Sequence, residues 1–158
     1  MNKNKQFNEI SRKISNHNDY NQIHKLLDEC SKIIFEIQIE KIRESRDVFF
    51  NLWLNIDDPY QPTQGACFEK LSTIIYRFVE NDPYVITKKH INEVKKFLYS
   101  DEFYVVDAGI SILHIVANTQ PELITSDLIT EIEDIAFSSN VTFPSIRTLS
   151  NSILSTVN

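Results

Sequence analysis

Apolar residues recur along most of the chain at intervals of three and four, the spacing that places them on one face of an α-helix. A short series opens the chain, and a longer one runs from Ile23 to Ile37, with Ile39 and Ile42 as its extension. Residues 47–56, DVFFNLWLNI, are apolar almost all round, as in a helix that neighbours cover on several sides. The pattern predicts an N-terminal helical layer over residues 1–56.

A break follows at residues 57–65, DDPYQPTQG, which hold two of the five prolines and one of the two glycines. We interpret this segment as the connection between two helical layers of one domain. Neither side has enough apolar sequence to suggest an independent core.

Beyond the break, one apolar pattern occurs twice with a shift of 38 residues. NDPYVITKKHINEVKKFLYS, residues 81–100, aligns with TQPELITSDLITEIEDIAFSS, residues 119–139, so that Thr87 corresponds to Thr125. A further shift of 38 takes Ala108 to Ile146. The two threonines are suitable N-caps, because a hydroxyl can accept a hydrogen bond from the unpaired backbone N–H groups of a first helical turn. The repeating unit is predicted to be a helical hairpin.

A single hairpin cannot bury both of its apolar faces, so repeated hairpins stack side by side. The period and the helix pairing resemble the HEAT and armadillo families over about residues 66–157, although no family signature residue matches and 38 residues is slightly short. The resemblance implies an all-α fold in which stacked hairpins form a short HEAT-like α-solenoid, within a single domain over residues 1–158. An all-α bundle with a chance internal similarity is the alternative.

Composition supports helices and weakens several functions. Two glycines and five prolines leave few turns for an all-β fold. A net charge of -6, from 16 basic and 22 acidic residues, disfavours nucleic acid as the partner. The most apolar run, residues 108–117, is about half a membrane span, and residues 1–15 lack the apolar stretch of a secretory signal. We expect a cytoplasmic monomer that binds neither membranes nor nucleic acid.

No residue constellation points to catalysis. The four histidines have no second ligand at metal-binding spacing, and His114 lies in an apolar run that suggests a core or boundary position. Cys30 and Trp53 follow apolar series and are expected in the core. Gly65 and Gly109 cannot form a phosphate-binding loop, and Gly109 is expected to permit close helix packing. The sequence predicts no catalytic residue, no metal, no cofactor and no enzyme activity.

Charge is inverted between the two copies of the repeat. Lys89 corresponds to Asp127 and Lys96 to Asp134, so stacked helices about 10 Å apart would place opposite charges side by side. Such lateral ion pairs are one explanation. Residues 101–158, however, hold one basic and eight acidic residues, which gives a net charge of -7. That excess favours a second explanation, an acidic surface that attracts a basic partner.

The candidate partner-binding residues combine these acids with nearby aromatic side chains, the type that often dominates interface energies. They are Asp101, Glu102, Phe103, Tyr104, Asp127, Glu131 and Asp134.

Small, acidic, helical chains of this kind resemble, loosely, bacterial immunity proteins that neutralise toxic nuclease domains, including those of contact-dependent growth inhibition systems. The resemblance implies a tight complex with a small basic toxin. One alternative is a non-catalytic helical-repeat adaptor, for which residues 47–56 would supply a second surface if exposed. The other is a HEAT-like DNA glycosylase, although its basic groove would here be reduced to Lys88, Lys89, Lys95 and Lys96.

Overall fold

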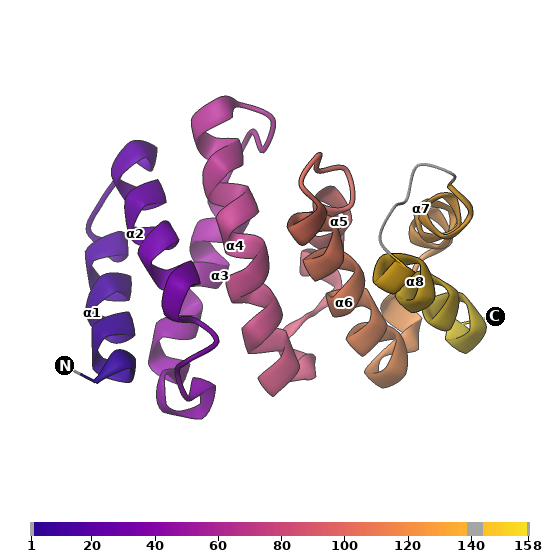
Figure 1. Cartoon of the computed structure of the whole chain (residues 1–158), viewed down its shortest axis with the longest axis horizontal. Helices are drawn as coiled ribbons and strands as arrows, with labels where there is room; N and C mark the ends of the chain where they lie inside the picture. Colours follow the sequence, from indigo (N-terminus) through magenta and orange to yellow (C-terminus); the bar gives the residue numbers. More distant parts are fainter. Residues whose placement is uncertain (1, 139–143, 158) are drawn as a thin grey trace. The chain divides into compact units, whose positions relative to one another are not determined.

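The fold is built of helices throughout the part of the chain that the structure describes, residues 2–138 and 144–157. This computed structural model contains eight α-helices and four short 3-10 helices, and those residues form no strand (Figure 1). The all-α prediction is therefore confirmed. The helices group into two compact units, Met1–Asn81 and Asp82–Asn158. The single domain and the α-solenoid stay predictions.

The unit Met1–Asn81 is a set of helices packed on one another, of which α4, with 20 residues, is the longest. α1 packs against α2 and α3, and α4 packs against the same two helices. Asn2 and Asp19 cap α1 and α2, because their side-chain oxygens accept the backbone N–H groups of Lys5 and Asn21 at 3.0 and 2.9 Å. The elements are α1 (Lys3–Ser15), α2 (Tyr20–Ile33), η1 (Ile39–Lys41), η2 (Arg43–Ser45), α3 (Arg46–Asn55) and α4 (Pro62–Asn81).

Aromatic side chains form the core of this unit. The ring centroid of Phe49 lies 5.2 Å from that of Phe7 and 6.0 Å from that of Phe78, which joins α1, α3 and α4. Trp53 is fully buried beside them. Each such ring pair contributes about 0.5–1.5 kcal/mol beyond its buried area. The expected burial of Trp53 is confirmed. Phe49 and Phe50 of α3 are also buried, whereas its other apolar residues, Val48, Leu52 and Leu54, are only half-buried, so the helix is covered mainly on its aromatic side.

The second helix is shorter than its apolar series predicts. α2 ends at Ile33, and Ile39 and Ile42 are buried from the two 3-10 helices instead. In a continued helix the N–H of Gln38 would bond to the carbonyl of Ile34. Here that carbonyl accepts from Nε of Arg77 at 3.4 Å, and the N–H of Gln38 donates to Asn4 Oδ1 at 2.9 Å. The chain has already left the helix before this point, because the carbonyl of Ile33 accepts the N–H of Glu36 at 2.9 Å, and beyond it partners distant in sequence bind both groups.

The break at residues 57–65 lies within the first unit. α4 begins at Pro62, a residue tolerated in the first helical turn because its missing N–H has no partner there. Gly65 allows the preceding loop to pass close by, since a Cβ at this position would lie 2.5 Å from the carbonyl oxygen of Pro59. The break therefore marks a tight turn onto α4, while the two compact units divide between Asn81 and Asp82.

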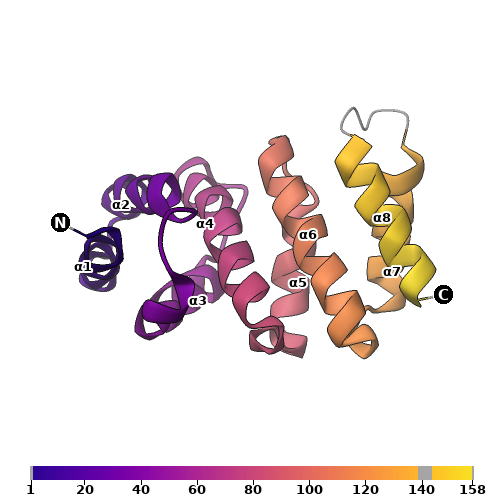
Figure 2. The ribbon, with the colours of Figure 1, turned by 60° about the horizontal axis from the view of Figure 1, so that its bottom comes forward.

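The unit Asp82–Asn158 repeats one arrangement twice, with α5 behind α6 and α7 behind α8 (Figure 2). α6 packs against α5 and α8, and α8 packs against α7. The elements of this unit are η3 (Pro83–Val85), α5 (Lys88–Phe97), α6 (Phe103–Thr119), η4 (Pro121–Leu123), α7 (Ser126–Phe137) and α8 (Pro144–Val157).

The turns that start α5 and α7 follow the 38-residue shift. Both threonines occupy the predicted N-cap positions, and Thr125 Oγ1 accepts the N–H of Leu128 at 3.3 Å. At the first copy, the Thr87 N–H donates to Nδ1 of His90 at 2.9 Å, a histidine version of the capping box. The side-chain amide of Gln120 donates to the carbonyls of Pro83 and Ile86 at 3.3 and 3.1 Å, which links the second turn to the first.

Gly109 sets the distance between α5 and α6. A Cβ at this position would lie 2.9 Å from Phe97 Cβ and 3.2 Å from Leu98 Cδ2. The expected role of Gly109 in close helix packing is confirmed.

The lateral ion pairs expected between α5 and α7 are not formed. Each of these helices packs on the helix that follows it in the chain. Lys96 Nζ bonds instead to Glu93 Oε1 of its own helix at 3.0 Å. Within residues 82–138 and 144–157, no ion pair joins Lys89 to Asp127 or Lys96 to Asp134. The inverted charges thus need another explanation.

Replacing Gly109 with alanine should destabilise the protein, although alanine in a helix normally gains up to about 1 kcal/mol over glycine. The added methyl meets Phe97 Cβ, an atom fixed to the backbone, so α5 has to move. Overpacking of this kind costs about 1–3 kcal/mol and should exceed the gain. Urea unfolding compares Gly109→Ala with Ser111→Ala, the control on the same helix. A more stable Gly109→Ala variant would contradict this packing.

Acidification should weaken the fold through His90. Burial, with a smaller effect of the Lys89 charge, lowers the pKa of His90 from 6.5 to about 4. The unfolded chain therefore binds the proton first, so stability is complete above about pH 6.5 and falls towards pH 4. The loss between pH 7 and pH 5 should be roughly 2 kcal/mol. Urea unfolding at both pH values measures it.

The matched control is His90→Gln, because glutamine also accepts a hydrogen bond at this position of a capping box but does not titrate. Its unfolding free energy should change much less over the same pH interval. Equal losses in the two proteins would assign the pH dependence to other groups.

Candidate functional site

The carboxylates of residues 101–134 lack counter-charges. Residues 101–158 include eight acids and one basic residue, Arg147. None of the eight forms an ion pair with a residue that the structure describes. The unit Met1–Asn81 offers a contrast, because the carboxylate of Asp28 forms ion pairs with both Lys32 and Lys70, each at 3.0 Å. The Asp82–Asn158 unit therefore presents negative charge that the fold itself does not neutralise.

Three of the predicted site residues lie along one side of α7. Asp127, Glu131 and Asp134 follow one another at four- and three-residue spacing, which aligns them on the helix surface. Asp127 and Asp134 are exposed, whereas Glu131 is half-buried. The opposite side of α7 carries the buried residues Leu128 and Ile132.

The other four predicted site residues lie at the start of α6. Asp101 and Glu102 are exposed in the turn before the helix. Phe103 and Tyr104 form its first turn, with 45% and 43% of their surface exposed. Both aromatic side chains are therefore partly exposed and partly packed at the start of α6.

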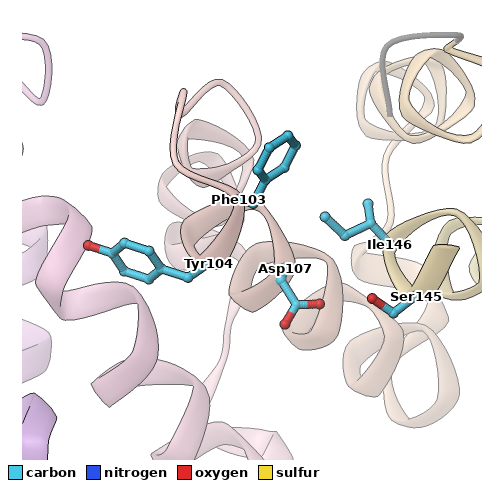
Figure 3. A pocket seen from close by; sticks show the side chains of 5 residues that line it. All are labelled: Phe103, Tyr104, Asp107, Ser145 and Ile146. Atoms are coloured by element: carbon cyan, nitrogen blue, oxygen red, sulfur yellow. The ribbon is translucent and has the colours of Figure 1, made fainter. Parts of the chain in front are cut away.

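A hollow of about 260 Å³ lies between the starts of α6 and α8. Its lining residues are Phe103, Tyr104, Asp107, Ser145 and Ile146. Figure 3 shows the side chains of Asp107, Ser145 and Ile146 facing one another across this space, with the ring of Phe103 at its edge. Tyr104 points its ring away from the α8 residues.

Asp107 has an unusual electrostatic setting for an exposed carboxyl group. Burial of the group raises its pKa above the ordinary 3.8. Asp28 provides the contrast, because hydrogen bonds from Lys32 and Lys70 lower its pKa below 3.8. A carboxylate that is partly desolvated without a cation is stabilised when a cation arrives.

The hollow joins two of the predicted residues to three that sequence reasoning did not select. Phe103 and Tyr104 were predicted, whereas Asp107, Ser145 and Ile146 were not. The repeat holds a signal for them, since Asp107 and Ser145 are 38 residues apart and therefore occupy equivalent positions. The acids of α7 do not line this hollow.

Cysteine and histidine side chains are placed as parts of the packing. Cys30 and Cys67 are buried, and burial raises the pKa of the Cys67 thiol to about 11, which disfavours the reactive thiolate. Nε2 of His114 lies 3.2 Å from Ser152 Oγ at a half-buried position, as expected for a boundary histidine. Among residues 2–138 and 144–157, no three His, Cys, Asp or Glu side chains are grouped as a metal site would require.

Comparison with protein-family models, curated proteins and solved structures found no significant match to this chain. Within the described ranges, every helix is too short or too polar to cross a membrane.

Asp107 and Asp28 should have titration midpoints on opposite sides of 3.8, the ordinary pKa of an aspartate side chain. Carboxyl carbon shifts measured by NMR should place the midpoint of Asp107 above that value and the midpoint of Asp28 below it. The stabilising effect of Asp28 is present above about pH 3.8 and is lost as its folded-state group protonates. At pH 7, Asp28→Asn should lower the melting temperature, whereas Asp107→Asn should not. The reverse order of midpoints would contradict this description of the hollow.

Proposed function

We propose that this chain is a non-catalytic binding protein that inhibits a basic protein by covering part of its surface. The observation that carries the proposal is the set of eight carboxylates in residues 101–134 that form no ion pair with any described residue. Unpaired surface charge raises the local potential and accelerates encounters with an oppositely charged partner. The exposed rings of Phe103 and Tyr104 add contact area near these charges.

The partner class that suits this surface best is a toxic nuclease domain, and we propose an immunity protein as the specific function. A nuclease presents a basic groove that binds phosphates, so an acidic helical surface competes for the same charges. Tight one-to-one binding at or beside such a groove would stop the toxin. Other basic proteins share this electrostatic requirement, and loss of nuclease activity on binding is what distinguishes a toxin.

The adaptor alternative loses the surface on which it depended. Phe49, Phe50 and Trp53 of α3 are buried within the first unit. The apolar segment of residues 47–56 therefore does not offer its aromatic side chains to a second partner.

A DNA glycosylase is also less well supported than an inhibitor. Of the four lysines that would form its groove, Lys95 and Lys96 are half-buried, and Lys96 pairs with Glu93. Little positive charge remains to bind a duplex.

Reversing the charge on α7 should weaken partner binding without unfolding the protein. The partner is first isolated on the tagged protein from lysate of its own source at about 50 mM salt and released at about 500 mM, since screening weakens exposed charge pairs. Calorimetry with the purified partner should then show at least a roughly tenfold lower affinity for the Asp127→Lys, Glu131→Lys, Asp134→Lys triple variant. Its melting temperature should change little, because these carboxylates form no ion pair.

The matched control carries the same charge change on the other unit, through Glu29→Lys, Glu40→Lys and Glu44→Lys, all at exposed positions. It should bind at nearly the unmodified affinity. If both triple variants lost the same affinity for the partner, the loss would be due to the change in net charge alone, which would contradict an interface on α7. A partner that keeps its full activity in a saturated complex would contradict the inhibitor function.

A further inference from the structure

Acidic, aromatic and aliphatic side chains all line the hollow between the starts of α6 and α8. Asp107 supplies a full negative charge, Phe103 an exposed aromatic ring, and Ile146 an apolar wall. Its volume of about 260 Å³ is below the roughly 300–1,000 Å³ of ordinary small-molecule pockets. The space therefore suits a single side chain better than a cofactor or a metabolite.

The negative charge of Asp107 favours a cation as the occupant of the hollow. Asp107 forms no ion pair with a described residue, and partial desolvation of its exposed carboxyl group raises its pKa, so a neighbouring cation would favour the charged form. The first turn of α8 opposes a cation with a partial positive charge of about half a unit, but the full charge of Asp107 is larger. A metal ion is a poor occupant, because one carboxylate and one hydroxyl are too few ligands for calcium or magnesium.

Arginine fits these surfaces better than lysine does. Its planar guanidinium can donate two parallel hydrogen bonds to the carboxylate of Asp107, which an ammonium group cannot do. The guanidinium is also more weakly hydrated than an ammonium group, so it loses less on entering a partly apolar space. Its methylene stem can pack on Ile146, and Ser145 Oγ can accept a further N–H.

We propose that this hollow is an anchor site for one arginine side chain of the basic protein partner. The inference rests on the proposed function for the existence of such a partner, but the recognition of arginine belongs to the hollow itself. The carboxylates of α7 then attract the partner over a broad surface, while the arginine fixes its position. Buried arginine residues paired in this way are frequent centres of interface energy.

A probe that carries only the side chain tests the hollow without the partner. The labelled full-length protein is titrated with Nα-acetyl-argininamide, and amide shifts are followed by NMR. A ligand of this size should bind in the millimolar range. The shifts should gather at the starts of α6 and α8. Nα-acetyl-lysinamide should bind at least roughly threefold more weakly, as expected for loss of the bidentate pair with Asp107.

Two controls test whether binding requires the positive charge of the ligand and whether it occurs at Asp107. The neutral isostere Nα-acetyl-citrullinamide should produce no saturable shifts. Asp107→Asn should weaken argininamide binding at least about tenfold, whereas Asp57→Asn, at an exposed carboxylate outside the hollow and outside the predicted partner-binding residues, should leave it unchanged. Scattered shifts, equal binding of citrullinamide, or equal binding to Asp107→Asn would overturn the proposal.

The same Asp107→Asn variant separates this inference from the proposed function. If the isolated partner binds it as tightly as the unmodified protein, the anchor is wrong while the inhibitor function stands. If argininamide binds the hollow but no basic partner is inhibited, the proposed function fails while the recognition of arginine stands. Loss of both argininamide and partner binding in Asp107→Asn supports the two together.

Discussion

The pairing of backbone groups at helix ends determines where each element of this protein stops and restarts. In the second unit, Thr87 and Thr125 occupy N-cap positions after a proline-led 3-10 turn, and Gln120 ties the second of these turns to the first. The helices stay short, and α6 and α8 pack together. The hollow at their starts, with Asp107 on one side and Ser145 on the other, is a consequence of that arrangement.

Much of the fold follows from local patterns. The threonine caps, the burial of Trp53 and the close packing at Gly109 all depend on residue type and spacing, which a single sequence displays. The end of α2 at Ile33 does not, because the segment beyond it is held by residues distant in sequence, such as Arg77, which lies 43 residues from Ile34. A periodic series of isoleucines contains no sign of such partners.

In the candidate site, too, the features set by local sequence could be predicted, and those set by distant partners could not. The exposure of Asp127 and Asp134 could be predicted, since the buried and outward sides of an amphipathic helix alternate in a known way. The lateral ion pairs and the hollow depend instead on which helices become neighbours. α5 packs on α6 while α6 meets α8, so Lys96 turns to its own helix and Asp107 acquires Ser145 and Ile146 as neighbours.

The unpaired carboxylates have a cost for the free protein, because like charges held on one small unit repel one another. Dissolved salt weakens this repulsion, and it would also weaken the attraction of these carboxylates to the basic partner that we propose. Ionic strength should therefore act in opposite directions on the free fold and on the complex that we propose. Low salt would destabilise the free protein most under the conditions in which a basic partner would associate fastest, and association with that partner would remove part of the repulsion between the carboxylates.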